Sequence, residues 1–292
     1  MTDLTVGVEE ELQLVDDSGA LRGVARKVIE KVAVDRDGAI EDVGGIEPEL
    51  QVSQLEIVTP VCESLGEVRG ELVRLRRLAA AAAESGCRLV SAGSNPGARW
   101  RDQQVTPKEP YEHIHEVYAQ LGREQVVFGC HVHVAVEDRD LRIRTMNHVR
   151  PWVPTLLALS ASSPYWQGDD TGYASYRYLT FSRWPTFLTP GVFDGWSDYQ
   201  THIDVLLESG SIDAPGRLYW TVRPSANFDT LEFRMCDACT SVDEAVLVTG
   251  LIRALVAVSL ERHAPASPLL MCAQSWCGRR SGGRPAGAST RS

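Results

Sequence analysis

Apolar and polar positions along this chain of 292 residues follow two periods. Alternation of apolar and polar residues predicts half-buried strands, and apolar residues three or four positions apart predict helices with one buried side. The strand pattern covers residues 4–15, 50–60, 87–97, 124–138, 217–225 and 229–237. The helical pattern covers residues 64–86, 110–122, 139–161, 195–210 and 241–263.

Proline residues refine the predicted helices, and the order of the segments indicates the fold class. Pro151 and Pro154 lie inside the segment 139–161, so we expect two helices there rather than one. Strands and helices are interspersed without regular β–α–β alternation, and the segments 217–225 and 229–237 are close enough to form a hairpin. The order therefore favours an α+β fold or a mixed sheet, with helices on one face of the sheet.

Two segments lack a clear period. Residues 162–191 are rich in aromatic residues, Gly and Pro, and a loop of this length is more often functional than idle. Residues 264–292 contain no acidic residue and are rich in Gly, Arg, Ser, Pro and Ala, so we expect a tail that does not pack. The predicted folded domain is therefore residues 1–263.

The first predicted strand carries three consecutive carboxylates in the sequence VGVEEELQL. Alternation places Glu9 and Glu11 on one face and Glu10 on the other face, together with valine and leucine side chains. Two carboxylates on one face repel each other unless a cation lies between them, and oxygen ligands of this kind suit Mg²⁺. A charged edge strand that faces solvent is the alternative.

Two other segments offer further metal ligands. Glu49 and Glu56 flank or lie within the segment 50–60, and Glu56 alternates against Leu55 and Ile57, which face the core. In the segment 124–138, His131 and His133 share one face. Such a pair can chelate a metal ion, or one of the two can serve only as a hydrogen-bond partner.

The predicted hairpin adds basic residues to the same kind of polar face. Alternation places Glu232, Arg234 and Cys236 on one side of the segment 229–237, and Arg223 lies on the partner segment. Arg beside Glu can be a plain cross-strand ion pair, or it can clamp a phosphate group. Taken together, the segments predict a sheet with helices on one face and ligands for Mg²⁺ and phosphate on the other.

Composition and charge exclude some classes of function. The formal net charge is -10, and a negative field repels nucleic acid. No apolar run approaches the roughly 20 residues that cross a bilayer, and the first residues lack the pattern of a secretory signal. We therefore expect a cytoplasmic protein that binds neither nucleic acid nor membranes. Cys236 and Cys239 have the spacing of a zinc or redox pair, but no second pair accompanies them, and we expect no disulfides.

Five motifs carry a resemblance to a known family: GVEEELQLVD, LEIVTP, GCHVHVAVEDRD, SASSPYWQGDDTGYASYR and WTVRPSANFDTLEFRMCD. From about residue 4 to about residue 260, the chain closely resembles bacterial carboxylate–amine ligases of the glutamate–cysteine ligase type 2 family. The resemblance implies a curved, mainly antiparallel sheet with helices on its outer face, similar to the glutamine synthetase and guanido kinase catalytic domain. It also implies ATP-dependent formation of an amide through an acyl phosphate.

The resemblance also implies cofactors, substrates and residue roles. ATP and Mg²⁺ would be the cofactors, amino acids such as glutamate and cysteine would be the substrates, and homo-oligomerisation is left open. Glu232, Arg234 and Arg223 would be catalytic, and Arg223, Arg234 and Arg177 would bind phosphates or a substrate carboxylate. The implied metal ligands are Glu9, Glu11, Glu49, Glu56, His131, His133 and Glu232.

One departure from the family leaves alternatives open. Family members usually continue for some tens of residues beyond the helix at 241–263, whereas here the segment 264–292 has the composition of a shifted reading frame. We therefore expect a catalytic domain that is shortened at its C-terminus. The alternatives to a ligase are a metal-dependent hydrolase built on His131 and His133 and a non-catalytic remnant.

Overall fold

The computed structural model describes residues 4–35, 45–83, 86–187 and 191–262. The tail predicted for residues 264–292 lies outside the described residues. In the described part, none of the helices is both long enough and apolar enough to cross a membrane.

The described residues form a seven-stranded sheet in the order β2-β3-β1-β5-β9-β8, with β4 also paired to β1. All of these pairings are antiparallel. The strands are β1 (Val6–Val15), β2 (Ile46–Pro48), β3 (Gln54–Val58), β4 (Arg88–Val90), β5 (Gly129–Ala135), β8 (Val222–Pro224) and β9 (Thr230–Asp237). A separate hairpin consists of β6 (Tyr165–Trp166) and β7 (Asp169–Asp170).

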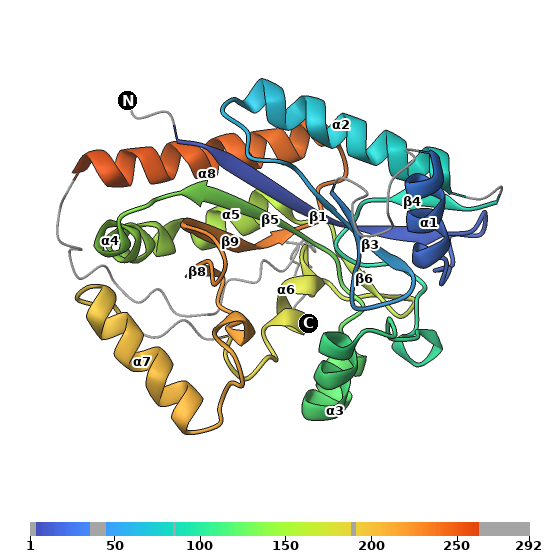
Figure 1. Ribbon diagram of the computed structural model, residues 1–292. Helices are drawn as coiled ribbons and strands as arrows, with labels where there is room; N and C mark the ends of the chain where they lie inside the picture. The colour runs from blue at the N-terminus through green and yellow to red at the C-terminus, as the bar shows by residue number, and fades with distance from the viewer. Residues whose placement is uncertain (1–3, 36–44, 84–85, 188–190, 263–292) are drawn as a thin grey trace, which may run out of the picture.

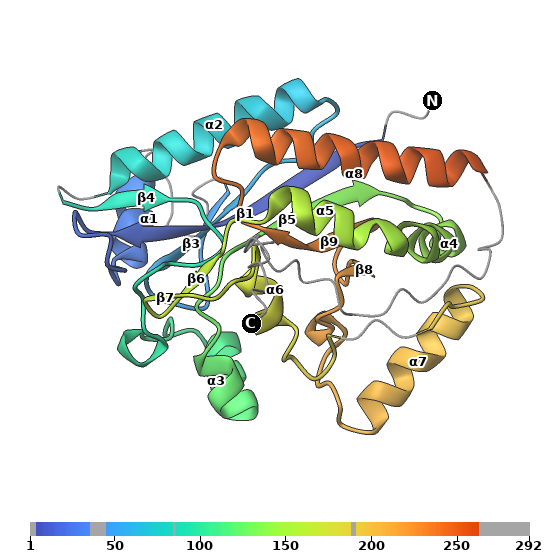
Figure 2. The same cartoon turned by 180° about the vertical axis from the view of Figure 1, so that it is seen from behind.

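Helices cover one face of this sheet, as Figures 1 and 2 show. The covering helices are α1 (Ala25–Asp35), α2 (Leu65–Ala82), α4 (Arg139–Val149), α5 (Val153–Ser160) and α8 (Val242–Arg262). On the other side lie α3 (Glu109–Arg123), α6 (Tyr176–Phe181) and α7 (Trp196–Glu208). Short 3₁₀ helices occur at Trp100–Asp102, Arg150–Trp152 and Pro215–Arg217. The α+β class and the mainly antiparallel sheet with helices on its outer face are thereby confirmed.

The core lies between the sheet and α2 and α8. Val8 and Leu12 of β1 are fully buried and belong to the same apolar cluster as Val68, Leu72 and Leu75 of α2. The spacing of the helical residues places them on one side of α2, and the alternation along β1 places its apolar residues on the side that meets them. Sequence periodicity therefore decides which face of the sheet remains free for polar groups.

A capping box starts one helix and proline divides another helical segment, as the sequence predicts. Ser241 and Glu244 form a capping box at the start of α8, in which the Glu244 amide donates to Ser241 Oγ and the Ser241 amide donates to Glu244 Oε2. The segment 139–161 is divided between α4 and α5 by the 3₁₀ helix that contains Pro151. Proline removes a helical donor at this point, which is why one continuous helix does not form.

Two segments differ from the expectation. Residues 50–60 do not form one strand: within them only β3 (Gln54–Val58) is regular, and the short strand β2 (Ile46–Pro48) lies before them, with Glu49 directly after it. The aromatic segment 162–191 is not a plain loop, since it contains the β6–β7 hairpin and α6. In both cases the ordered pieces are too short to show a period in the sequence.

A β-bulge interrupts the pairing of β5 with β9. Cys130 pairs with Cys236 and Val132 pairs with Phe233, so His131 alone lies opposite both Arg234 and Met235. The extra residue reverses the alternation, and Cys236 is buried in the apolar core rather than placed on the polar face, so that expectation was wrong. The described cysteines are free thiols, and none belongs to a potential metal-binding group of the described residues.

Candidate active site

A polar row crosses the uncovered face of the sheet, perpendicular to its strands. At one end, Glu47 of β2 pairs in register with Glu56 of β3, and Glu56 pairs with Glu11 of β1. Residues in register point to the same side of a sheet, so three carboxylates stand side by side across three strands. Like charges in this position destabilise the fold, which indicates that the row serves something other than stability.

The same row continues across the centre of the sheet with histidines and ends at an arginine. Glu9 of β1 pairs with His131 of β5, His133 of β5 pairs with Glu232 of β9, and Glu232 pairs with Arg223 of β8. The acidic end and the basic end of the row therefore lie on opposite sides of the two histidines.

Glu9 is the central member of the row. Its Oε2 lies 3.2 Å from His131 Nδ1, and its Oε1 lies 3.2 Å from His133 Nε2. Burial opposes ionisation of Glu9, but the hydrogen bonds and charge of the two histidines outweigh it and hold the pKa of Glu9 well below its usual range. Burial and then the charge of Arg234 lower the pKa of His131, while its contact with Glu9 acts in the opposite direction.

The ligand atoms around Glu9 form two groups that are compact enough to hold a metal ion. Glu9, Glu56 and His131 form one group, and Glu9, His133 and Glu232 form the other, with ligand atoms within 4.8 Å of one another in each. Glu9 belongs to both groups and can bridge them. His131 Nε2 is buried without a hydrogen-bond partner among the described residues. Buried polar atoms are ordinarily paired, so this nitrogen is a candidate ligand atom.

The negative charge of the carboxylates at the acidic end of the row is poorly balanced by the described part of the protein. Burial, followed by the charge of Glu11, raises the pKa of Glu49 to about 7. Burial, followed by the charges of Glu49, Glu9, Glu11 and Glu47, raises the pKa of Glu56 well above its usual range. Glu11 accepts a hydrogen bond from the Gly129 amide at 2.5 Å, and the Tyr111 hydroxyl lies 3.1 Å from Glu49. These contacts leave most of the negative charge unbalanced, and a hard divalent cation would balance it.

The basic end of the row is built around Glu232. Arg223 donates to it from Nε at 2.7 Å and from Nη2 at 3.2 Å, and Arg234 donates from Nη1. Burial opposes ionisation, but the charges of Arg234 and Arg223 hold the pKa of Glu232 well below its usual range. Glu232 is therefore an ionised carboxylate at neutral pH.

The two arginines differ in how many donors they keep for a ligand. Arg223 also donates from Nη1 to the carbonyls of Gly216 at 2.8 Å and Leu218 at 2.5 Å, so most of its N–H groups are used inside the protein. Arg234 Nε is buried and has no hydrogen-bond partner within the described ranges, and its guanidinium lies 6.0 Å from the centre of the Phe181 ring. Arg234 is consequently the better placed of the two to meet an anionic ligand.

Arg177 is a residue of α6 that contacts the backbone of β9, and it is not a member of the polar row. Its side chain is 1% exposed and donates to the carbonyls of Met235 at 3.3 Å and Arg234 at 3.4 Å. A Cβ atom at Gly129 would lie 2.0 Å from Arg177 Nη2, so a larger residue at position 129 would displace the guanidinium. Contact with a substrate carboxylate stays a prediction for this residue.

Asp237 is a residue of this region that pattern reasoning missed. It is fully buried and accepts hydrogen bonds from Ser162 N at 2.9 Å, Ser163 Oγ at 2.7 Å and Ser175 Oγ at 2.8 Å. These serines precede and follow the β6–β7 hairpin, so Asp237 fastens both ends of the hairpin to the end of β9. The serines at both ends of the aromatic segment were the only sequence signal. No sequence signal indicated the contact of the Thr230 hydroxyl with His133 Nδ1, at 2.9 Å.

Glu10, the third carboxylate of the triplet, has a separate role on the covered face. It is fully buried and receives two hydrogen bonds from Arg76 of α2, at 2.9 Å and 2.7 Å. Arg76 also donates to the carbonyls of Cys239 and Thr240 before α8. This ion pair ties β1, α2 and the start of α8 together and takes no part in the polar row.

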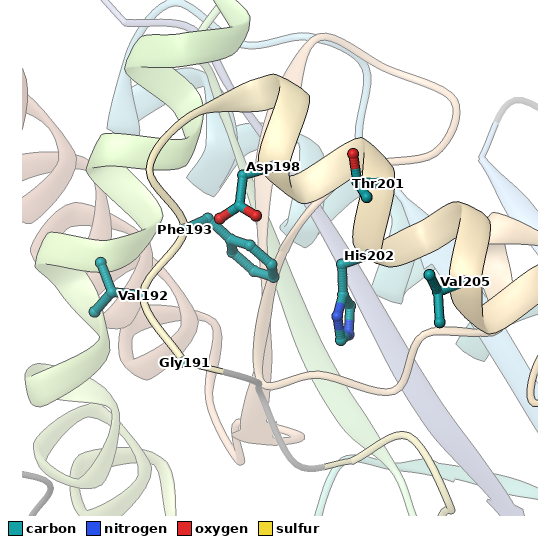
Figure 3. A pocket seen from close by; sticks show the side chains of 7 residues that line it. All are labelled: Gly191, Val192, Phe193, Asp198, Thr201, His202 and Val205. Carbon is teal, nitrogen blue, oxygen red and sulfur yellow. The ribbon is translucent and has the colours of Figure 1, made fainter.

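A hollow of about 310 Å³ lies apart from the polar row, beside α7 (Figure 3). Phe193, Asp198 and His202 project toward it, and none of the residues that line it belongs to the row. Apolar side chains line it as often as polar ones, and it contains a single carboxylate, Asp198. The carboxylates, histidines and arginines of the row therefore define the candidate active site, and this hollow does not.

The fold is that of known ligases. A solved glutamate–cysteine ligase from Francisella tularensis, in complex with AMP, superposes with a TM-score of 0.64 at 14% identity over 91% of this chain and 68% of that chain. A solved bifunctional glutathione synthetase from Pasteurella multocida gives a TM-score of 0.64 at 17% identity over 89% of this chain and 39% of that chain. At such low identity these likenesses show the fold alone.

Sequence comparison is more specific. The family model for glutamate–cysteine ligase family 2 matches residues 5–276. Proteins provisionally named glutamate–cysteine ligase 2 in Rhodopirellula baltica and 2-1 in Saccharopolyspora erythraea are each 43% identical to it. The alignments cover 91% and 97% of this chain and 72% and 75% of those proteins. The chain belongs to glutamate–cysteine ligase family 2, which indicates that it is a ligase.

Proposed function

We propose that this chain joins an amino-acid carboxylate to an amine at the expense of ATP, with glutamate and cysteine as the reference substrates. The observation that carries the proposal is the row of carboxylates around Glu9, whose charge the described residues leave largely unbalanced, next to the Arg234 guanidinium on the same face. Membership of the family and the likeness to a glutamate–cysteine ligase with bound AMP support it.

The donor set fits Mg²⁺. Carboxylate oxygens outnumber imidazole nitrogens in the row, and hard divalent cations prefer oxygen. Glu9, Glu56 and His131 would hold one ion and Glu9, His133 and Glu232 a second, with Glu11 and Glu49 completing the acidic end. Bound there, Mg²⁺ would neutralise the charge of the transferred phosphoryl group and orient it.

The protein's own side chains would position the reactants. Arg234 would bind phosphate oxygens through the guanidinium edge that Glu232 leaves free, and Arg223 would hold Glu232 in its orientation. A substrate carboxylate oxygen would attack the γ-phosphorus as ADP leaves, giving an acyl phosphate. The amine would then attack the acyl carbon as phosphate leaves and the nitrogen loses a proton. This route needs charge neutralisation and alignment more than covalent protein chemistry.

The test is phosphate release from MgATP by the full-length chain, with glutamate as acceptor and a panel of amines that includes cysteine. We expect phosphate release that depends on both the carboxylate and the amine, with an amide of the expected mass. EDTA should abolish it, and Glu56→Gln should reduce it at least about 100-fold, since positioning of the transferred group is lost. Glu116→Gln, an exposed position on α3, is the matched control and should leave activity unchanged.

Two outcomes would overturn the proposal. Hydrolysis that needs a divalent metal but not ATP would support a metal-dependent hydrolase built on His131 and His133. Saturable binding of MgATP without turnover, across the whole panel of amines, would support a non-catalytic member of the family.

A further inference from the structure

Phe228 is an exposed aromatic side chain at the edge of the candidate active site. It lies in the turn between β8 and β9 and is 61% exposed. The centre of its ring lies 6.1 Å from that of His133, a member of the polar row, and the two ring planes meet at 85°. A single exposed apolar residue is common on protein surfaces, so the exposure of Phe228 matters only because of this position.

The turn that carries Phe228 is fastened to the rest of the protein. The Ser225 amide donates to the Thr230 carbonyl at 3.0 Å, and the Thr230 amide donates to the Phe228 carbonyl at 2.8 Å. The next residue, Asp229, accepts a hydrogen bond from Arg142 of α4 at 2.8 Å. Arg142 is itself buried and donates to two backbone carbonyls. The backbone beneath the exposed ring is therefore held in place.

Phe228 lies beside one of the two groups of ligand atoms and far from the acidic end of the other. His133, which it contacts, forms its group with Glu9 and Glu232. Glu56 of the other group lies on β3, three strands away from β9 in the sheet. At about 4.8 Å between neighbouring strands, this separation is roughly 14 Å. A ligand that contacts Phe228 would therefore meet the Glu232 end of the row, where the arginines lie.

We propose that Phe228 is the surface on which the base of the nucleotide stacks, an inference that rests on the proposed function. Arg234 and Glu232 lie on β9, and Phe228 lies in the turn just before it. The six positions from Phe228 to Arg234 span roughly 20 Å when fully extended. A nucleoside triphosphate laid along this line would place its phosphates near Arg234 and Glu232 and its base at the exposed ring.

The nucleotide base suits an exposed phenyl ring better than the other reactants do. Among the reactants of the proposed reaction, the base is the one large planar group with a π face, and bases of any sequence stack on aromatic side chains. Glutamate is charged at both ends, and charged groups lose free energy when they leave water for an apolar contact. The side chain of cysteine is too small to cover the ring of Phe228.

The test compares the binding of MgATP with that of magnesium tripolyphosphate, which has the same chain of phosphates but neither base nor ribose. Binding to the full-length chain is measured by calorimetry without amino acids. Phe228→Ala should raise the Kd for MgATP about 5- to 100-fold, because the stacking contact is lost. It should change the Kd for magnesium tripolyphosphate by less than about twofold, and Phe228→Trp should retain the binding of MgATP because its ring can also stack.

Leu247→Ala is the matched control, because Leu247 is 56% exposed on α8, one of the helices on the covered face of the sheet, and it should leave both constants unchanged. Equal weakening of both ligands by Phe228→Ala would show that the ring only supports His133, and this would overturn the proposal. An unchanged Kd for MgATP in Phe228→Ala would overturn it as well.

The binding assay separates this inference from the proposed function. If the wild type forms the amide and Phe228→Ala binds MgATP normally, the stacking role fails and the proposed function stands. If MgATP binding depends on Phe228 but no carboxylate and amine pair gives a product, the stacking role stands and the proposed function fails.

Discussion

Replacement of Glu56 by glutamine is expected to stabilise the metal-free protein while it impairs the site. Glu56 lies in register with Glu11 on one side and Glu47 on the other, and the charges that act on it most strongly within the described residues are those of other carboxylates. Glutamine keeps the shape of the side chain and removes its charge. The variant should therefore relieve repulsion between neighbouring carboxylates, which under the proposed function a bound cation would otherwise offset.

The magnitude follows from the strand pairing. Two like-charge pairs directly opposite one another cost up to about 1 kcal/mol each, so the variant should gain about 1–2 kcal/mol in free energy of unfolding. For a domain of this size, roughly 2–4 °C per kcal/mol gives an increase in Tm of about 2–8 °C.

The gain in free energy of unfolding should depend on pH. Burial and neighbouring carboxylates raise the pKa of Glu49 to about 7 and that of Glu56 well above its usual range. Between the unfolded and folded pKa values the folded protein binds more protons than the unfolded chain, so these groups lower stability as pH rises. The stabilisation by Glu56→Gln should therefore be small near pH 5 and largest near pH 8.

The assay is thermal unfolding in EDTA at pH 5, 6.5 and 8, compared with unfolding in saturating MgATP at pH 8. Glu116→Gln on α3 should change stability by no more than about 0.5 kcal/mol at any pH. MgATP should stabilise the wild type more than the variant, because ligand binding to the folded state adds to stability. A variant that unfolds at the same or a lower temperature than wild type in EDTA at pH 8 would refute the reasoning.

Four other substitutions separate structural from functional roles. Glu10→Gln should lower the free energy of unfolding in urea by about 3–5 kcal/mol, because it leaves Arg76 partnered mainly by carbonyls, and a loss below about 1 kcal/mol would show that the pair is dispensable. Asp237→Asn should cost about 1–3 kcal/mol locally and speed proteolysis between β6 and β7 without changing the products, whereas unchanged proteolysis would show that the hairpin does not rely on this carboxylate. Under the proposed function, Arg234→Lys should raise KM for MgATP about tenfold or more, while Arg223→Lys should lower kcat chiefly through a misoriented Glu232. Equal effects of both lysine variants on both constants would contradict that division.

Features that depend on neighbouring residues could be predicted from the sequence. Alternation along the first strand correctly places Glu9 and Glu11 on the face opposite Glu10, because side chains of a strand point to alternate sides whatever the tertiary fold. The capping box of α8 and the break at Pro151 are equally local. The order of the segments predicted the α+β class, and the family resemblance added the mainly antiparallel sheet, which the strand pairing confirms.

Features that depend on distant partners could not be predicted. Arg76 reaches Glu10 from 66 positions further along the chain, and no periodicity connects them. The bulge opposite His131 exists only in the pairing of two strands, yet it sends Cys236 into the core. Glu49 directly follows β2, a strand of three residues that is too short for its alternation to be recognised, so the pattern located only the strand that contains Glu56.

The triplet Glu9, Glu10 and Glu11 shows why a carboxylate cannot be assigned from its type alone. On the covered face a buried carboxylate must have a fixed counter-charge, and Arg76 provides it. On the open face the carboxylates of the acidic end mainly meet one another, and their repulsion is the free energy that a bound cation would release. A fixed arginine among them would stabilise the fold without a ligand and would occupy the position that the proposed function gives to a cation. In the part of the chain that the structure describes, the arginines of the row lie at the Glu232 end instead, and under the proposed function one face would then hold metal ions and phosphate side by side.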